Sequence, residues 1–588
     1  APQSSHGEDS TNTVQPPPPP PPANVNSVLT AIRNSSSPNN TIRHPSERVL
    51  QQWSDTYLHH HTCNYLTSLL YIIDWESSTA GGNAAAAGVV EESSRLMAAI
   101  LFKNCVPKAF SVPIDSLLEG ITTATTTVCN DNDTNALRVF IDQLRHERNV
   151  IRQTLPNLLF RARTDSSNNY DKTLMLHLQL ALSNIALFDF PTGWPTLLEE
   201  LMHVVKNGSG GATAIRGDND TGMIMIVRVR AIQALRMCLS SIRHRKIVVQ
   251  KGRGGGRRGG GGRQQQQHPM MDMRHLESMI GKAVHERKEV HRMACNIFNG
   301  LAEGIIQHAQ LAVTGGSSSS GVGQEGDATC TAWQMECKLA TQYIKCMTEV
   351  IPMLEIEQVV HSDPRVPAVR SLLDNLTQIC QAVKAYPFVS TPSTLMGVSS
   401  IHQQEMTIQM DKLYRATLTC CMSSMKYQPQ LFATQITAVL PSVVEPILTL
   451  DEAVLQSMPV KRLIVMTSFI QMVLQCALYD ERRKDRLGSK NAVLSMLMGR
   501  KGGGSGNDES GDGSNPNNDP AVIAARETVT ALLAEGTIER LIECIVGKFL
   551  MLHPDEVEEW ESDPEGRYET DLAEEAMLDA ASPRHCGG

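Results

Sequence analysis

Apolar residues recur at intervals of three and four positions through most of this chain of 588 residues. That spacing places them on one face of a helix, because an α-helix completes a turn every 3.6 residues. Alternation of apolar and polar residues over five or more positions, which marks a half-buried strand, is scarce. The pattern therefore predicts an all-α fold. One clear stripe, within a predicted helix at 172–188, consists of Leu174, Leu178, Ala181, Leu182 and Ile185.

The end of that stripe predicts a helical hairpin. Pro191 ends the first helix, because its ring clashes with the preceding turn and it has no N–H to donate. Pro195 stands where a first-turn proline is tolerated, so we expect a second helix to start near Trp194 and to run to 206. Two helices joined by so short a turn pack antiparallel, and they need further neighbours to bury their apolar faces. The residues that define this hairpin are Asp189, Pro191, Trp194 and Pro195.

Helical patterns of this kind follow one another along the whole chain. Pairs recur every few tens of residues, close to the ~40–47 residues of HEAT and armadillo units. We therefore predict a HEAT-repeat (armadillo-like) α-solenoid superhelix, in which each repeat contacts only its neighbours and tolerates insertions between units. The other predicted helices lie at 45–74, 91–104, 112–122, 135–162, 223–249, 271–311, 331–357, 367–386, 404–426, 430–449, 451–479, 490–499 and 521–552.

Segments of biased composition separate these helices. The first 44 residues are rich in Pro, Ser and Asn, and we expect them to form a disordered tail. The predicted organisation is this tail at 1–44, repeats at 45–206, a linker at 207–222, a repeat helix at 223–250, a Gly/Arg/Gln-rich insertion at 251–268, repeats at 269–499 with a Gly/Ser linker at 314–327, a Gly/Asn/Asp-rich linker at 500–520, repeat helices at 521–554 and an acidic segment at 555–588.

Composition excludes some function classes. The net charge is −9 and the isoelectric point is about 6.1, so the chain as a whole is not a nucleic-acid binder by charge. The chain has fourteen cysteines and no CxxC pair. Several of them fall within helical patterns: Cys337, Cys346, Cys380 and Cys476. This usage is typical of a protein in a reducing compartment, in which cysteine serves as a small apolar core residue. No apolar run approaches the roughly 18 residues of a membrane span, and no signal peptide is visible, so we expect no membrane insertion.

Candidate metal and catalytic residues form no convincing site. His59, His60, His61 and Cys63 are metal-ligand types, but consecutive histidines point around a helix instead of to one face. In the segment from His285 to His291 the second histidine falls at i+6, whereas a zinc-protease helix needs i+4. The sequence contains no GxxxxGK(S/T) phosphate-binding loop, no GxSxG nucleophile elbow and no GxGxxG motif between a predicted strand and a helix. We therefore expect no metal, no cofactor and no enzyme activity.

The segment Lys251–Arg263 alternates glycine with arginine, as RNA-binding segments do. It contains no aromatic residue on which a base can stack, and it lies between two predicted helices. Its composition favours a flexible insertion, so we consider RNA an unlikely partner. An RNA-binding adaptor acting through this segment stays open as the weakest alternative.

Three segments resemble the importin-β (karyopherin) family of nuclear transport receptors. Glu47–Trp53 with Tyr65–Leu70 resembles the first helix pair of the importin N-terminal domain. Arg95–Phe110 resembles that domain's Arg-x-x-Ala…Lys-Asn helix, with Phe110 where the family often has Trp. Ile185–Leu198 resembles the family's Asp/Glu-x-Pro-x-x-Trp-Pro-x-Leu hairpin. Their order and spacing agree with the family, and the resemblance assigns the repeats at 45–206 to an importin N-terminal-type, Ran-binding region.

A fourth segment resembles the importin seven, eight and eleven relatives, and importin eleven most closely. Phe549–Leu552 is followed by an acidic stretch, and we take Glu558, Glu559, Trp560, Glu561 and Asp563 as candidate cargo-binding residues. Family receptors are much longer, so we expect this chain to be an N-terminal portion of one. A solvated loop is an equally good interpretation of the whole run Asp555–Glu575, because blocks of like charge are usually solvated.

The resemblance implies a receptor that binds the GTP form of the small GTPase Ran on the concave side of its N-terminal helices. Arg95, Lys103 and Asn104 are the polar candidates for that contact. It further implies basic protein cargo that is released when Ran-GTP binds, contacts with nucleoporin FG repeats, and a location in cytoplasm, nucleus and nuclear pore. Two alternatives stay open: an exportin-type receptor that binds cargo together with Ran-GTP, and a HEAT-repeat scaffold that does not bind Ran.

Overall fold

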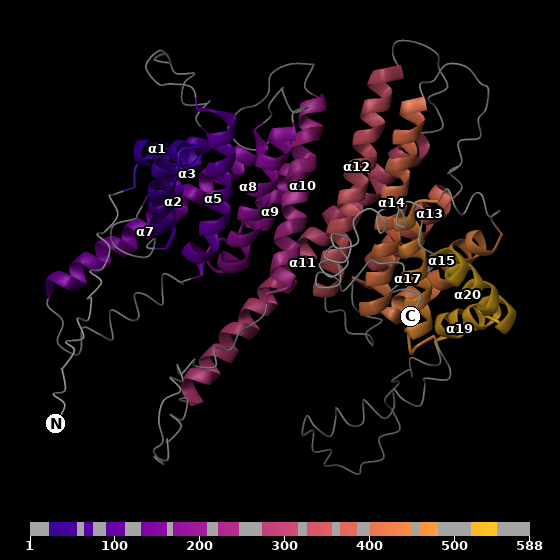
Figure 1. The fold of residues 1–588 in the computed structure, drawn as a ribbon. Coiled ribbons are helices and arrows are strands. Elements are labelled where there is room, and N and C mark those ends of the chain that lie inside the picture. Colours follow the sequence, from indigo (N-terminus) through magenta and orange to yellow (C-terminus); the bar gives the residue numbers. More distant parts are fainter. Residues whose placement is uncertain are drawn as a thin grey trace, which may run out of the picture. The chain divides into compact units, whose positions relative to one another are not determined.

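The structure is a computed structural model, and every regular element that it describes is a helix (Figure 1). No strand occurs among the residues that the structure describes. The chain divides into two compact units, one up to Trp194 and one from Pro195 onward, and we describe each by itself. The described residues are 23–55, 64–74, 90–111, 131–161, 169–208, 221–245, 273–315, 326–354, 365–384, 400–449, 458–479 and 519–549.

The first unit is a succession of packed helices. Helix α3 packs on α1 and α5, α5 packs on α8, and the long helix α7 lies against α3 and α8. Its core contains large apolar side chains such as Trp53 and Tyr65, whose ring centroids are 5.8 Å apart. The helices are α1 (Val25–Ser35), α2 (Asn40–Asp55), α3 (Tyr65–Ile73), α5 (Glu92–Phe110), α7 (Asp131–Phe160) and α8 (Asn169–Asp189).

Helix α1 corrects the expected boundary of the disordered tail. Residues 25–35 are helical, although the sequence pattern assigned 1–44 to the tail, and α2 begins at Asn40. The helix starts with a capping box, since the Asn24 side chain accepts from the Ser27 amide at 2.9 Å and the Ser27 hydroxyl accepts from the Asn24 amide at 3.0 Å. Val28 and Ile32 are fully buried. A two-turn apolar stripe among Ser and Asn residues is easily mistaken for low-complexity sequence.

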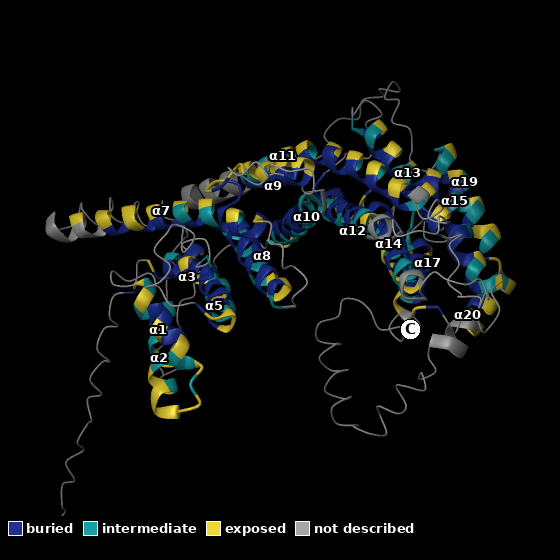
Figure 2. Ribbon diagram, turned by 90° about the horizontal axis from the view of Figure 1, so that it is seen from above, coloured by how far each residue is buried: buried dark blue, intermediate teal, exposed yellow. Residues whose placement is uncertain are grey.

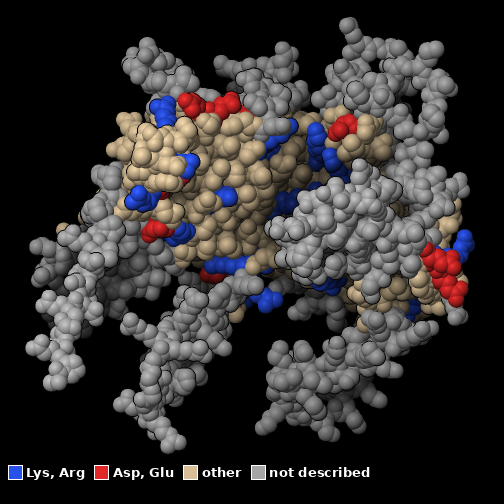
Figure 3. Space-filling model, viewed as in Figure 1, with Lys and Arg blue, Asp and Glu red and all other residues tan. Residues whose placement is uncertain are grey.

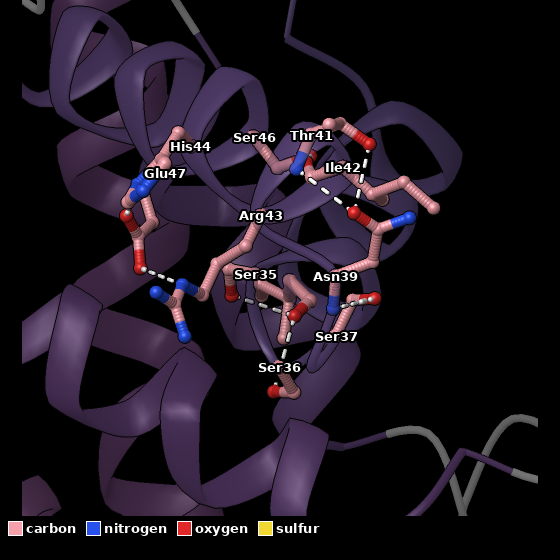
Figure 4. Close-up of polar contacts among 11 residues, drawn as sticks. Ser35, Ser36, Ser37, Asn39, Thr41, Ile42, Arg43, His44, Ser46 and Glu47 are labelled. Atoms are coloured by element: carbon pink, nitrogen blue, oxygen red, sulfur yellow. Dashed lines mark hydrogen bonds and ion pairs between the residues drawn. The ribbon is translucent and has the colours of Figure 1, made fainter.

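A short turn joins α1 to α2 (Figure 4). The Asn39 side chain accepts hydrogen bonds from the amide and the hydroxyl of Thr41, at 3.0 and 2.8 Å, which satisfies a free donor at the start of α2. One turn further, Glu47 lies 3.6 Å from Arg43 and 3.2 Å from His44 on the exposed side. The turn is therefore fixed by local polar contacts.

The second unit is built from two rows of helices. Along one row α9, α11, α13, α15 and α19 contact one another in succession, and along the other α10, α12, α14 and α17 do so. Members of the two rows also pack on their neighbours in sequence, as in α9 with α10 and α11 with α12. The elements are α9 (Leu197–Asn207), α10 (Thr221–Arg243), α11 (Met273–Gly315), α12 (Gly326–Val350), the 3₁₀ turn η2 (Ile351–Met353), α13 (Val366–Lys384), α14 (Ser400–Tyr427), α15 (Pro429–Thr449), α17 (Val460–Gln475), α19 (Pro520–Leu532) and α20 (Glu535–Phe549).

Burial follows this packing. Figure 2 shows the buried positions, in dark blue, where neighbouring helices meet, and the exposed positions, in yellow, on the outer sides. Cys337, Cys346 and Cys380 are buried free thiols, which confirms the prediction that they act as core residues, and Cys476 is half-buried. Burial raises the pKa of the Cys337 thiol to about 12.

Several element boundaries differ from those that the pattern predicted. The helix predicted over 521–552 is two helices, separated at Leu533 and Ala534. Within the stretch predicted as helix at 451–479, α17 begins at Val460 after Pro459, and 451–457 lie outside the described residues. A proline is tolerated just ahead of a helix because the backbone N–H that it lacks is not needed there for a helical hydrogen bond. The predicted helices at 112–122 and 490–499 lie outside the described residues.

Helix α15 is, within the described residues, long and apolar enough to cross a membrane by length and composition alone. This corrects the expectation that no segment approaches that length. Thr, Gln, Ser and Pro interrupt its apolar run, so that the mean hydropathy of 1.5 is not obvious by inspection. In the apolar window 56% of residues are buried, and α15 packs on α13, α14 and α19. A core helix meets the same criteria, so this property is weak support for a membrane span.

Candidate functional site

The predicted hairpin turn lies between α8 and α9. Helix α8 ends at Asp189, and the turn includes Pro191 and Trp194, both of which are buried. Helix α9 begins at Leu197 after its N-cap Thr196, three residues later than the predicted start at Trp194. Pro195 therefore precedes the cap and is exposed, instead of occupying the first turn. A proline ahead of the cap serves the same end, because its missing N–H is not needed there.

Asp189 organises this turn with both its backbone and its side chain. Its carbonyl accepts from the amides of Gly193 and Trp194, at 2.6 and 3.1 Å. Its carboxylate, which is only 6% exposed, accepts from Nε and Nη2 of Arg152 on α7 at 3.0 and 2.7 Å. Charge-assisted bonds of this kind are about twice as strong as neutral ones. Asp189 therefore holds the turn to α7 through Arg152, a contact that its position in the sequence motif does not reveal.

Arg95 has a structural position as well, which corrects its candidacy as a surface contact. Its side chain is buried, at 5% exposure, and Nε donates to the carbonyl of Ile73 at 3.0 Å. That carbonyl belongs to the last turn of α3, where backbone acceptors have no partner within the helix. Arg95 therefore ties α5 to the end of α3, and little of it is accessible to a protein partner.

Lys103 and Asn104 remain accessible on α5, but they face different neighbours. Lys103 is half-buried and lies near His177 of α8, whose pKa is lowered by burial and then by the Lys103 charge. Asn104 is exposed and lies one turn before Lys108, which pairs with Asp55 of α2 at 2.7 Å. The structure thus brings Lys103 together with His177. Arg95 is not part of this pair, because it is buried against the end of α3.

Other candidates from the sequence are placed as follows. The acidic candidates Glu558, Glu559, Trp560, Glu561 and Asp563 lie outside the described residues, as do 59–63 and 251–263. His285 is exposed on α11. His291 binds the Met353 carbonyl through Nδ1 at 3.0 Å and Arg365 through Nε2 at 2.9 Å, so it joins α11 to neighbouring segments. No group of three potential metal ligands is present in the described part of the chain.

The structure reveals one polar cluster that the sequence did not indicate, which we call the basic face. It consists of Arg236 on α10, Lys345 on α12, and Lys412 and Arg415 on α14. These three helices are consecutive members of one row of the second unit. Burial lowers the pKa of Lys345, and the positive charges of Arg236, Arg415 and Lys412 lower it further. The four cations therefore lie close together.

Few carboxylates balance the basic face. Arg415 binds Asp411 on its own helix at 2.7 Å, whereas the other three cations have no hydrogen bond or ion pair within the described ranges. The nearby carboxylate of Glu349 pairs with Arg243 at 2.9 Å. Figure 3 shows Lys and Arg gathered over the α10–α12 region with few acidic side chains beside them.

No sequence motif indicates this cluster, because its members are far apart along the chain. Each is a single basic residue in an ordinary amphipathic helix, and Arg236 precedes Lys412 by more than 170 positions. Only the side-by-side packing of α10, α12 and α14 makes them neighbours.

No known family model matches this chain, and no curated protein matches it. The structure shows that its described residues form an all-helical protein, and the resemblance to transport receptors rests on the quoted segments.

Proposed function

We propose that this chain is a nuclear transport receptor of the importin-β type, built as a HEAT-repeat α-solenoid. It binds Ran-GTP on its N-terminal helices and carries protein cargo into the nucleus, and it acts by binding, without chemistry. The observation that carries the proposal is the packing in the second unit. There, successive helices of each row contact one another, and each described helix from α9 to α17 also packs on a neighbour in sequence, as repeats in a solenoid do.

The three family-like segments support the proposal, since each falls on helices of the corresponding kind. Glu47–Trp53 lies on α2 and Tyr65–Leu70 on α3. Arg95–Phe110 lies within α5, and Ile185–Leu198 spans the end of α8, the turn and the start of α9. A resemblance in sequence that also respects the helix boundaries is stronger support than either feature alone.

The Ran contact that we propose is centred on Lys103 of α5, with His177 of α8 beside it and Asn104 at its edge. Lys103 is half-buried and has no hydrogen bond or ion pair among the described residues, so its charge is available to a partner. Arg95 supports this surface from inside by holding α5 on α3.

Transport then follows from negative coupling between two ligands of one flexible helical array. Ran-GTP lowers the affinity for cargo, and by linkage cargo lowers the affinity for Ran-GTP equally. Basic cargo binds the acidic segment that contains Glu558, Glu559, Trp560, Glu561 and Asp563, and FG repeats of nucleoporins give access to the pore. The receptor shuttles between cytoplasm and nucleus.

A pull-down with Ran locked in its GTP or GDP form tests the proposal. We expect binding to the GTP form alone, and about tenfold weaker binding by Lys103→Glu, as for the loss of one charged contact. Lys172→Glu, at an exposed position of α8 in the same unit, is the matched control and should bind as the wild type does. Equal or absent binding to both forms of Ran would favour the scaffold without Ran.

Adding basic cargo protein to the same beads separates import from export. Displacement of cargo by Ran-GTP is the import result, because the two ligands oppose each other. Retention of cargo together with Ran-GTP would instead identify an exportin-type receptor and contradict the direction that we propose.

A further inference from the structure

We infer that the basic face of Arg236, Lys345, Lys412 and Arg415 is a docking surface for an aspartate- and glutamate-rich segment of a partner protein. This inference is independent of the proposed Ran contact, which lies in the other unit. It assigns to the chain an acidic partner, whereas the transport proposal assigns a basic cargo to a different segment.

The arrangement of the helices suits an extended acidic chain. Neighbouring helices pack with axes about 8–10 Å apart, so the cations of α10, α12 and α14 form a series with steps of that order. An extended polypeptide advances about 3.3 Å per residue. Carboxylates at every second or third position of such a segment can therefore meet successive helices.

The charge balance of the face favours an anionic ligand. Three of its four cations lack an acidic partner within the described structure, and Lys345 is half-buried between its neighbours. Like charges held together in a partly desolvated place destabilise each other, and burial first, then this repulsion, lowers the pKa of Lys345. A bound carboxylate removes the repulsion and gains charge-assisted hydrogen bonds. Asp411 meanwhile fixes the Arg415 guanidinium in place.

The surroundings favour a polypeptide over a nucleic acid. Proteins that bind single strands combine basic grooves with aromatic side chains on which bases stack. The aromatic residues nearest the cluster on α12 and α14, Tyr343 and Tyr414, are buried and offer no such platform. The chain as a whole has a net charge of −9, which repels a long polyanion.

Fluorescence anisotropy with the full chain tests the inference. The probe is a labelled twelve-residue peptide of Asp, Glu and Gly without aromatic or phosphate groups, and its Asn/Gln counterpart is the uncharged control. We expect Arg236→Gln and Lys345→Met each to weaken binding about tenfold. Arg370→Gln, which removes an exposed arginine from α13, should bind the peptide as the wild type does. Circular dichroism verifies that each variant is folded.

Three outcomes would overturn the inference. One is equal binding of the acidic and the uncharged peptide, or equal binding by all variants. Another is tighter binding of oligothymidine at the same residues, which would make the face a nucleic-acid site. The third is that the wild-type chain does not bind the acidic peptide, whereas the full chain carrying Glu558→Gln, Glu559→Gln, Glu561→Gln and Asp563→Asn does bind it. That result would show that the chain's own segment covers the face.

Discussion

The ring of Tyr343 on α12 occupies the space in which any Cβ at Gly304 of α11 would stand. One turn further along α11, His308 stacks on the same ring with centroids 5.3 Å apart. At the far end of the contact, Trp333 donates from Nε1 to the Ala312 carbonyl at 2.7 Å. Helices α11 and α12 thus approach closely because position 304 has no side chain.

Replacing Gly304 by alanine should destabilise the second unit by about 1–3 kcal/mol, because the new methyl group overpacks the contact. Denaturant unfolding followed by circular dichroism measures this change. Gly536→Ala is the matched control, since nothing lies within 4 Å of its Cβ position. That variant should be neutral or stabilised by up to ~1 kcal/mol, because alanine favours a helix over glycine. A neutral Gly304→Ala would show that the close approach is absent in solution.

The two partners of the Arg152–Asp189 pair should respond unequally to truncation. The Arg152 side chain is 21% exposed and can turn toward solvent, whereas the Asp189 carboxylate is 6% exposed and cannot. Arg152→Ala therefore leaves a buried charge unpaired and should cost about 3 kcal/mol or more, and Asp189→Ala should cost less. Urea midpoints of the two variants give the comparison. Equal losses would mean that burial does not distinguish the two charges.

Lys345 should make stability depend on pH in an unusual direction. Its pKa is lowered in the folded state by burial and like charges, so the unfolded chain binds the proton more strongly. Stability should therefore rise with pH between the lowered pKa and the ordinary value of about 10.5. Lys345→Met should be more stable than wild type at pH 7, and the difference should shrink toward pH 10.

Urea unfolding at both pH values measures this effect. Lys288→Met, at an exposed position of α11, serves as the control and should leave stability unchanged at pH 7. A destabilised Lys345→Met would indicate that Lys345 has an acidic partner in the folded chain.

Buried thiols should be almost unreactive in the native protein. Burial raises the pKa of Cys420 to about 12 and that of Cys105 to about 12, so their thiolate fraction at pH 8 is on the order of 10³ lower than that of a free cysteine. Among the cysteines whose burial is described, iodoacetamide labelling mapped by mass spectrometry should modify half-buried Cys295 and Cys476 before the buried thiols. Rapid labelling of Cys420 without denaturant would contradict its place in the core.

Loss of the α1 cap should loosen the N-terminal end of the first unit. Asn24→Ala removes the acceptor of the Ser27 amide and should cost about 1 kcal/mol. Faster hydrogen exchange of the Ser27 amide reports the change. Asn26→Ala, at an exposed neighbouring position where no side-chain bond holds the helix start, should leave that amide as protected as before.

Local sequence was a good guide to where helices form and how they end. The stripe from Leu174 to Ile185 predicted α8, and Pro191 correctly marked the region of its end, because period and proline geometry act over a few residues. The same logic underestimated α1, whose two buried turns lie among residues that usually signal disorder.

The places of individual polar side chains depended on packing between distant segments. Arg95 belongs to a surface-like motif, yet the end of α3 comes close enough to bury it. Asp189 finds Arg152 from another helix, and Arg236, Lys345 and Lys412 become neighbours only because α10, α12 and α14 lie side by side.

The sequence by itself thus determined the helical elements, since hydrogen bonding and apolar period are local properties of a segment. The tertiary structure alone decided which charges are buried, paired or left to face one another, because helix packing brings together residues from distant parts of the chain.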